Sequence, residues 1–274
     1  MRSDSRAPLS RRHFCALAGT LLAAPAAAVA SAEEELPEAA RLFGDYDGAF
    51  VLRSMRDGRT LRYQPKRCAQ RFAPCSTFKI PNSLIGLETG VIPSLDYEMK
   101  WDGKKRHIES HNRDHTLRTA YRDSVLWYYE RLAERVGTER MRRFVREFRY
   151  GDQNVPDGGE QFWLDALTIS PNEQVEFLER FYRYELPVSR RTMEQVREIM
   201  VAEKTERGTL RGKTGTQGYA KDGKLFATYG WYVGWVEHDG TAHLFAAHLS
   251  GGENPIGFTA RQVVTELLRG RGLL

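Results

Sequence analysis

The sequence predicts an α/β domain of the α+β type, in which one antiparallel sheet is built from both ends of the chain. Segments rich in β-branched and aromatic residues lie near the start, at 48–54 and 60–63. Similar segments lie near the end, at 209–214, 227–237 and 241–249. The residues between them have apolar side chains at helical spacing. We therefore expect a sheet flanked by helices, a helical insertion, and a cleft between the two.

The early strands are joined through Asp57-Gly58, a dipeptide typical of hairpin turns. A helix is expected from about Ser76 to Glu88. Pro81 lies early in this helix and removes one backbone hydrogen bond, so we expect a kink or an irregular first turn.

Further helices fill the middle of the chain, around a turn-rich loop at 150–160. They are expected at Thr116 to Val136, Glu139 to Phe148, Asn172 to Tyr184 and Arg191 to Met200. The last two strands are joined through Asp239-Gly240, and a final amphipathic helix is expected from about Phe258 to Arg269.

The first 32 residues are typical of a secretory signal peptide. SRRHF at 10–14 supplies paired arginines before an apolar run that ends in ASA at 30–32. The arginine pair indicates the twin-arginine route, so we expect cleavage after Ala32 or Ala30 and a periplasmic protein. A membrane anchor is the alternative, but the run is rich in small alanines and interrupted by Gly19 and Pro25. Residues 33–274 then form a single domain, with no stable membrane insertion.

Charge gives no indication of a nucleic-acid partner. The formal net charge of +5 falls to +2 when residues 1–32 leave, because they hold four arginines and one aspartate. The densest basic run, Arg140 to Arg149, has apolar residues at helical spacing and neighbouring glutamates. It is interpreted as a solvated helix face and not as a phosphate-binding patch.

Two cysteines remain after Cys15 leaves with the signal peptide. Cys68 and Cys75 lie seven residues apart around a short turn, in a chain expected to be exported. We expect a disulfide that braces the segment before Ser76. Two buried thiols are the alternative.

Ser76 and Lys79 are the candidate catalytic pair. Ser76 is the only serine with a lysine three residues later, and on a helix these two side chains share a face. The helix N-terminus favours the negative charge that develops on a reacting oxygen. A lysine activates a serine only when it is neutral or modified, and burial favours the neutral form. A capping serine followed by a solvated lysine is the alternative.

Four further motifs fit a serine nucleophile. Ser124 supplies a second hydroxyl that could relay a proton to a leaving group. Lys213-Thr214-Gly215 follows a strand, where a cation and a hydroxyl can hold a carboxylate and glycine allows close backbone approach. Tyr150-Gly151-Asp152 opens the long loop, and Phe162-Trp163-Leu164 closes it.

In this order the motifs resemble those of penicillin-recognising serine enzymes, and more closely those of class D (oxacillinase-type) β-lactamases. STFKIPNSLIGLETG, KWDG, NRDHTLR, YGDQNVPDGGEQFWL, LRGKTG and GWYVGWVE all resemble that family, over almost the whole mature chain. Class A relatives would have Asp-Asn after the second serine, where this chain has Val125 and Leu126. The resemblance implies a β-lactamase/DD-transpeptidase-like fold.

The resemblance also implies a double-displacement hydrolysis of β-lactam antibiotics, and hence antibiotic resistance. Ser76 attacks the β-lactam carbonyl, and the backbone N–H groups of Ser76 and Thr216 form the oxyanion hole. Lys79 is carboxylated by carbon dioxide and acts as the base for acylation and deacylation. No metal or other cofactor is implied.

Other residues of the implied site hold the substrate and the carbamate. The indole N–H of Trp163 binds the carbamate, and Ser124 relays a proton to the ring nitrogen. Lys213, Thr214 and Arg261 bind the substrate carboxylate, Arg261 through its planar guanidinium.

Three positions depart from the family pattern. Leu126 replaces a valine and could restrict water near the carbamate. Asp152 replaces a usual asparagine, and His111 stands where an indole is common.

Two other functions and one metal site are alternative interpretations of the sequence. A β-lactam sensor would stay acylated, and a DD-peptidase would resolve its acyl-enzyme on peptide. The sequence has no multi-span membrane portion to suggest a sensor, and Trp163 favours the carbamate-using branch over the peptidase. His107, His111 and His115 have zinc-like spacing, but they lie in a polar loop without a HExxH motif. Substrate range and homodimer formation are left open.

Overall fold

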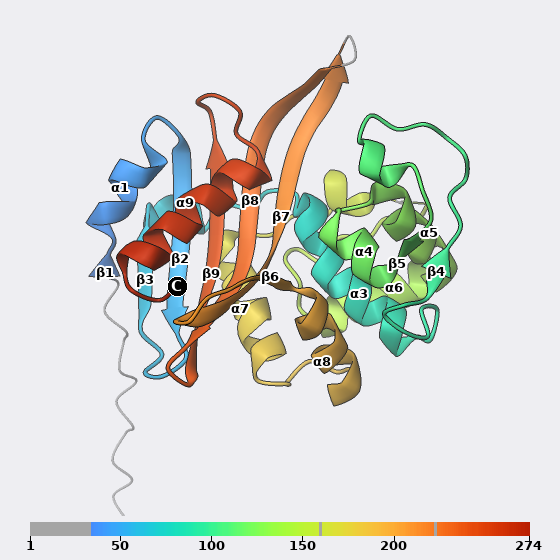
Figure 1. Ribbon diagram of the computed structural model, residues 1–274, viewed down its shortest axis with the longest axis horizontal. Helices are drawn as coiled ribbons and strands as arrows, with labels where there is room; N and C mark the ends of the chain where they lie inside the picture. The colour runs from blue at the N-terminus through green and yellow to red at the C-terminus, as the bar shows by residue number, and fades with distance from the viewer. Residues whose placement is uncertain (1–33, 159–160, 222–223) are drawn as a thin grey trace, which may run out of the picture. The chain divides into compact units, whose positions relative to one another are not determined.

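A computed structural model describes residues 34–158, 161–221 and 224–274, so the predicted signal peptide lies outside the described residues. The elements form a main sheet and a group of helices beside it (Figure 1). In chain order they are β1 (Glu34–Glu35), α1 (Pro37–Phe43), β2 (Asp47–Ser54), β3 (Thr60–Tyr63), α2 (Pro65–Cys68), η1 (Cys75–Phe78), α3 (Lys79–Glu88), β4 (Glu98–Met99), η2 (Glu109–His111), β5 (His115–Thr116), α4 (Leu117–Arg122), α5 (Leu126–Val136), α6 (Thr138–Glu147), η3 (Phe162–Leu164), α7 (Pro171–Tyr182), α8 (Arg190–Ile199), β6 (Val201–Lys204), β7 (Gly208–Lys221), β8 (Lys224–His238), β9 (Thr241–Ser250) and α9 (Gly257–Gly270).

The main sheet joins both ends of the chain, as the sequence predicts. Its strand order is β1-β3-β2-β9-β8-β7-β6, and every neighbouring pair is antiparallel except β1 with β3. The hairpin of β2 and β3 pairs Leu52 with Leu61 and turns through Gly58, whose φ is +73°. Gly58 adopts this left-handed backbone at no steric cost.

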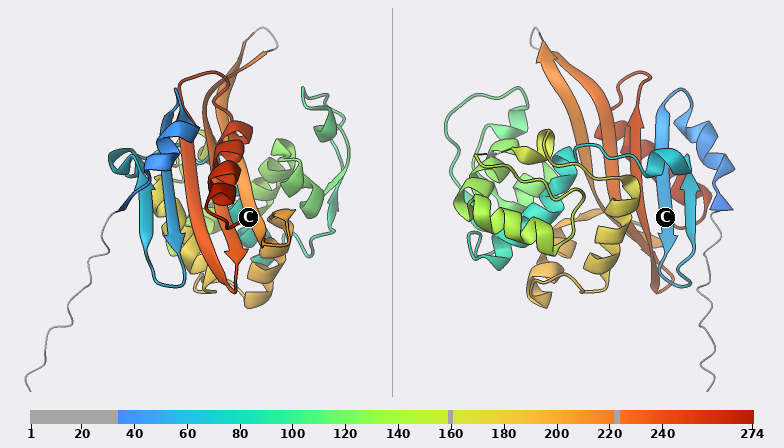
Figure 2. Two further views of the ribbon diagram at one scale, coloured as in Figure 1. Left: turned by 60° about the vertical axis from the view of Figure 1, so that its left-hand side comes forward. Right: turned by 180° about the vertical axis from the view of Figure 1, so that it is seen from behind.

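Helices cover both faces of this sheet. On one face α1 and α9 pack over an apolar cluster that includes Phe50, Phe245 and Val264. On the other face α7 lies against β2 and β9 (Figure 2). A larger cluster, including Leu84 of α3 and Trp235 of β8, continues from that face into the helical insertion. The segment that carries Ser76 and Lys79 therefore lies where the sheet meets the helical insertion.

The C-terminal strands extend further than the sequence predicts. The predicted strand at 209–214 is β7, which continues to Lys221, and β6 was not predicted. β7 pairs with β8 from Gly208 to Lys221, with one irregularity after Gln217. Long-range pairing therefore maintains the strand through a glycine-rich stretch that has low strand propensity.

The predicted helix at 76–88 begins irregularly. Residues Cys75–Phe78 form a 3₁₀ turn, and the α-helix starts only at Lys79. Pro81 is the third residue of α3, where its missing N–H is tolerated. Ser76 therefore lies in the turn that leads into the helix.

The predicted helix at 116–136 is wrong as a single element. It is divided into α4 and α5, and Ser124 lies in the break with φ of +57°. Asp and Ser compete for backbone hydrogen bonds and favour helix ends, which accounts for a break at Asp123-Ser124.

The predicted disulfide between Cys68 and Cys75 is also wrong. Both thiols are buried and are not bonded to each other. The Cys68 thiol donates to the Tyr63 carbonyl at 3.2 Å, and the Cys75 thiol approaches the Ala73 carbonyl at 3.5 Å. The segment before Ser76 is held by other contacts, described below. Within the described residues no helix has the length and apolar character needed to cross a membrane.

His248 of β9 is buried in an aromatic cluster beneath the segment that precedes Ser76. Its ring stacks on Phe72 with centroids 3.8 Å apart and meets the edge of Trp231 at 4.7 Å. Neither ring nitrogen has a hydrogen-bond partner among the described residues. Burial, with a smaller effect of the Arg67 charge, lowers the pKa of His248 from 6.5 to about 3.

The lowered pKa of His248 predicts that the folded protein loses stability in acid. Because the folded pKa lies below the unfolded one, its contribution is complete above pH 6.5 and decreases as the pH falls towards 3. We expect this group to lower the free energy of unfolding by about 2 kcal/mol at pH 5 relative to pH 7. His248→Phe, which keeps a ring in the stack, should reduce this pH dependence in urea denaturation. Equal pH dependence in both proteins would contradict the prediction.

Candidate active site

Ser76 and Lys79 face each other across one turn. The Lys79 Nζ lies 2.9 Å from the Ser76 Oγ. Ser76 is partly exposed and can be reached from solvent, whereas only 2% of Lys79 is exposed. The pair therefore combines an accessible hydroxyl with a buried amine.

Burial makes the Lys79 amine unusually easy to deprotonate. Desolvation lowers the pKa of Lys79 from 10.5 to about 8. At pH 7 about a tenth of such an amine is neutral, compared with about one in 3,000 for an ordinary lysine. A neutral amine can accept the Ser76 proton or react with carbon dioxide.

The turn that carries Ser76 is held by hydrogen bonds from β8 and by one hydrogen bond within the turn. The indole N–H of Trp231 and the hydroxyl of Tyr229 both donate to the Ala73 carbonyl, at 3.0 and 3.3 Å. The Thr77 hydroxyl donates to the Pro74 carbonyl at 2.7 Å. These bonds fix the backbone immediately before the nucleophile.

A second set of bonds connects the turn to the long loop and α7. The Gln174 amide donates to the Thr77 hydroxyl at 3.0 Å, and the Tyr150 hydroxyl donates to the Gln174 side-chain oxygen at 3.3 Å. All three side chains are buried. Tyr150 is therefore connected to the Ser76 turn through Gln174 and Thr77, a connection that sequence spacing did not indicate.

β7 passes close to the nucleophile turn at Gly215. A Cβ placed on Gly215 would lie 3.0 Å from the Pro74 carbonyl oxygen and 3.3 Å from the Thr77 nitrogen. A larger residue would therefore push the strand away from the turn. The next residue, Thr216, accepts a hydrogen bond at its hydroxyl from the Gly257 N–H at 2.9 Å, which joins β7 to α9.

Lys213, Thr214 and Arg261 are brought together beside β7. They line a pocket of about 420 Å³ with residues of α4, α8 and β6. The Lys213 ammonium donates to the Thr214 carbonyl at 3.0 Å, and Arg261 donates to the Ala202 carbonyl at 3.2 Å. Burial, then the charges of Lys79 and Arg261, lowers the pKa of Lys213 well below its ordinary value. An anion here would relieve this repulsion.

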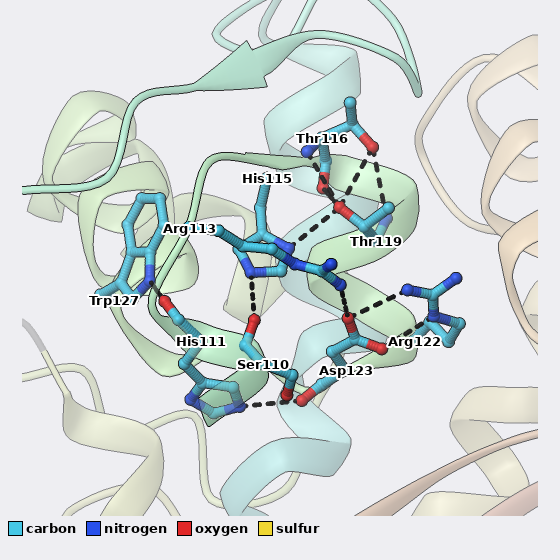
Figure 3. A network of polar contacts seen from close by, with 9 residues as sticks. All are labelled: Ser110, His111, Arg113, His115, Thr116, Thr119, Arg122, Asp123 and Trp127. Atoms are coloured by element: carbon cyan, nitrogen blue, oxygen red, sulfur yellow. Dashed lines mark hydrogen bonds and ion pairs between the residues drawn. The ribbon is translucent and has the colours of Figure 1, made fainter. Parts of the chain in front are cut away.

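Asp123, the residue before Ser124, belongs to a network of charged and polar groups (Figure 3). The Asp123 carboxylate accepts hydrogen bonds from Arg122 at 2.7 Å and Arg113 at 3.1 Å. The Asp123 carbonyl lies 2.9 Å from the His111 Nε2. The Ser124 N–H donates to the Tyr121 carbonyl at 3.3 Å, so the break between α4 and α5 is fixed on both sides.

The histidines of the rejected zinc motif connect loops. His115 lies 3.0 Å from the Thr119 hydroxyl and 2.9 Å from the Ser110 carbonyl, through different ring nitrogens. The Trp127 indole N–H donates to the His111 carbonyl at 2.8 Å (Figure 3). Within 34–158, 161–221 and 224–274, no three His, Cys, Asp or Glu side chains are grouped to hold a metal ion.

Trp163 lies in the aromatic layer behind the catalytic pair. Its ring stacks on Phe78, the residue before Lys79, at a centroid distance of 5.5 Å and an angle of 10°. Only 1% of Trp163 is exposed. Leu126, the first residue of α5, is partly exposed. Trp163 lies in η3, which packs against η1, and Leu126 lies in α5, which packs against α3, the helix that begins at Lys79.

The Asp152 departure has a structural explanation. Its carboxylate accepts hydrogen bonds from the Thr168 N–H at 3.0 Å and the Thr168 hydroxyl at 2.6 Å. It also accepts from the Asn154 N–H at 3.2 Å. The side chain is exposed and holds together the two ends of the long loop.

Comparisons with known proteins identify the family. Residues 37–269 match the penicillin binding protein transpeptidase domain. The chain is 39% identical over 234 residues to the probable β-lactamase YbxI of Bacillus subtilis, covering 85% of this chain and 84% of that protein. Among solved structures, the class D β-lactamase BAT-2 matches with a TM-score of 0.79 and 35% identity, over 86% and 96% of the two chains. The chain belongs to the class D β-lactamases.

Further matches include another class D β-lactamase and a regulatory protein. The class D β-lactamase FUS-1 (OXA-85) of Fusobacterium nucleatum subsp. polymorphum has a TM-score of 0.81 and 31% identity, over 88% of this chain and all of that chain. The regulatory protein BlaR1 of Bacillus licheniformis is 33% identical over 227 residues, covering 82% of this chain but 37% of that protein. The family resemblance of the motifs and the fold class predicted from the sequence are therefore confirmed. As a class D β-lactamase, the chain is a serine hydrolase.

Proposed function

We propose that this class D β-lactamase hydrolyses the β-lactam amide of penicillin-type antibiotics through an acyl-enzyme on Ser76, with carboxylated Lys79 as general base. The observation that carries the proposal is the 2.9 Å separation of Lys79 Nζ from Ser76 Oγ, with the amine buried. The expected export signal at residues 1–32 would place this activity in the periplasm, where it would confer resistance.

In the first step, the Ser76 Oγ forms a bond to the β-lactam carbonyl carbon while its proton passes to the base on Lys79. The backbone N–H groups of Ser76 and Thr216 stabilise the oxyanion. The C–N bond then breaks, and the proton held by the base passes through Ser124 to the departing nitrogen, which restores both the base and the Ser124 hydroxyl. In the second step, water loses a proton to the same base and bonds to the ester carbonyl carbon. The ester C–O bond then breaks, and the departing Ser76 oxygen takes that proton from the base.

The surroundings of Lys79 fit a lysine that carries carbon dioxide. Carboxylation needs a neutral amine, which the lowered pKa of about 8 supplies. When bound to Lys79, the carboxyl group would supply an anionic base for both steps. Trp163 lies in the adjoining aromatic layer, where its indole N–H, which is only a donor, suits an anion.

The substrate carboxylate has a complementary site in Lys213, Thr214 and Arg261. Their pocket brings Lys213 and Arg261 together beside the strand that passes Ser76, and a bound anion would favour the charged form of Lys213. A carboxylate bound there would hold the β-lactam carbonyl near the Ser76 hydroxyl.

The deciding experiment is turnover of nitrocefin and benzylpenicillin by purified residues 33–274, with and without added bicarbonate. We expect many turnovers per enzyme and a higher rate with bicarbonate, because carbon dioxide regenerates the base. The similarity to BlaR1 makes a β-lactam sensor the second candidate. A single stoichiometric burst would favour the sensor and contradict the proposal. Release of D-alanine from a peptide without β-lactam turnover would indicate a DD-peptidase.

A further inference from the structure

A buried tyrosine of α5 covers the Lys79 side chain. The Lys79 Nζ lies 5.1 Å from the centroid of the Tyr129 ring. Tyr129 is completely buried, and α5 packs against α3. The ring therefore occupies space beside the amine that water would otherwise fill.

A single serine connects this ring to the lysine backbone. The Ser83 Oγ lies 2.7 Å from the Lys79 carbonyl oxygen and 2.9 Å from the Tyr129 hydroxyl. A carbonyl oxygen can only accept, so the one Ser83 proton is donated to Lys79. The Tyr129 hydroxyl must then donate to Ser83. The direction of both hydrogen bonds is thus fixed by the chemistry of the groups.

These contacts close a loop between two helices. From the Lys79 backbone the loop passes through Ser83 to the Tyr129 hydroxyl, and the ring returns it to the Lys79 amine. The Asn82 amide adds a longer bond of 3.4 Å to the Tyr129 carbonyl. All four residues are buried, so solvent does not compete for these bonds.

We propose that Tyr129, held by Ser83, is a positioning residue that keeps the Lys79 amine directed at Ser76 and shielded from water. The inference rests on the proposed function, because it concerns the same base. Tyr129 makes no contact with substrate in this role and acts only through Lys79.

The chemistry of the phenol suits this task. Burial raises the pKa of Tyr129 well above its ordinary value, so the hydroxyl remains a donor and adds no charge beside the lysine. The aromatic face attracts an ammonium ion, but it does not replace the water that it excludes, so desolvation still favours the neutral amine. A ring free to move would admit water, favour the ammonium form and slow the reaction with carbon dioxide.

The test compares Tyr129→Phe with Tyr128→Phe in the purified enzyme. Tyr128 is also completely buried, and its hydroxyl donates to the Tyr97 carbonyl at 3.2 Å. Each variant loses one hydrogen bond donated by a tyrosine hydroxyl, but only Tyr129→Phe removes a bond of the loop around Lys79. We expect Tyr129→Phe to raise the bicarbonate concentration for half-maximal nitrocefin turnover by roughly fivefold, the equivalent of one neutral hydrogen bond. Tyr128→Phe should remain within about twofold of the wild type.

Two further variants keep the inference falsifiable if one protein folds poorly. Ser83→Ala removes the acceptor of the Tyr129 hydroxyl and should also raise the bicarbonate requirement. Tyr129→Leu removes the ring, and should raise it further and move the acid limb of the pH profile to higher pH. Thermal melting identifies variants that are only unstable. Equal bicarbonate requirements and pH profiles for Tyr129→Phe, Ser83→Ala and Tyr128→Phe would overturn the inference. Bicarbonate-independent turnover by the wild type would instead refute the proposed function.

Discussion

Lys79→Ala should abolish steady turnover of penicillins, with kcat reduced by about a thousandfold or more. The variant loses the amine that lies 2.9 Å from the Ser76 Oγ, and with it the base that the proposed mechanism uses in both steps. Alanine leaves a buried gap beside Ser76 but no base. Stopped-flow and steady-state hydrolysis of nitrocefin would measure the loss, and mass spectrometry would report any slow acylation of Ser76.

Lys100→Ala provides a control for loss of a lysine. Lys100 is exposed and pairs with Glu98 and Asp114, so its removal should leave kcat within about twofold. Bicarbonate should raise turnover of Lys100→Ala as it does for the wild type, and should not rescue Lys79→Ala. Turnover by Lys79→Ala near the wild-type rate would remove Lys79 from the mechanism.

Elements defined by local patterns could be predicted from the sequence. The β2–β3 hairpin has a short apolar run and a turn dipeptide, and the predicted strands coincide with the observed ones within a residue or two. α6, α7 and α8 each carry a distinct apolar face, so their predicted bounds were also close. Periodicity within a segment is sufficient where that segment buries one face.

Elements determined by distant partners could not be predicted in the same way. The second half of β7 is rich in glycine and is a strand because β8 pairs with it residue by residue. Asp123 and Ser124 favour a break locally. Hydrogen bonds to Asp123 from His111 and Arg113, which lie ten or more residues earlier, hold the backbone at this point. The expected disulfide was wrong because proximity in sequence does not set the direction of two thiols.

The same distinction holds within the active site. The Ser76 and Lys79 spacing is local, so a helical turn was enough to bring the two groups together. Tyr129 and Gln174 lie about 50 and 100 residues from this pair, in helices whose buried faces contain other aromatic and polar residues. No spacing rule distinguishes them from ordinary core residues. Only the fold shows that they adjoin the nucleophile turn.

Trp163→Phe should allow acylation but slow release of the acyl group by about a hundredfold. Phenylalanine retains a ring for the stack on Phe78, which lies 5.5 Å away, but removes the indole N–H. If that N–H holds the carboxyl group on Lys79, its loss should weaken the base most in the water-dependent step. Trp163→Ala should trap the adduct as well, but a buried tryptophan replaced by alanine also costs about 3–5 kcal/mol of stability. The phenylalanine variant separates the two effects.

Trp235→Phe is the matched control for this experiment. Trp235 is buried, and its indole N–H donates to the Glu237 carboxylate at 3.2 Å, so the substitution removes a comparable bond. Its ring packs against Phe181 and Tyr182 of α7 and not against the nucleophile turn. Intact-protein mass spectrometry after mixing with benzylpenicillin should show a persistent adduct in Trp163→Phe and rapid clearance in Trp235→Phe. Because bicarbonate raises the carboxylated fraction by mass action, saturating bicarbonate should partly restore deacylation in Trp163→Phe. Clearance at the wild-type rate without added bicarbonate would show that the indole N–H does not hold the base.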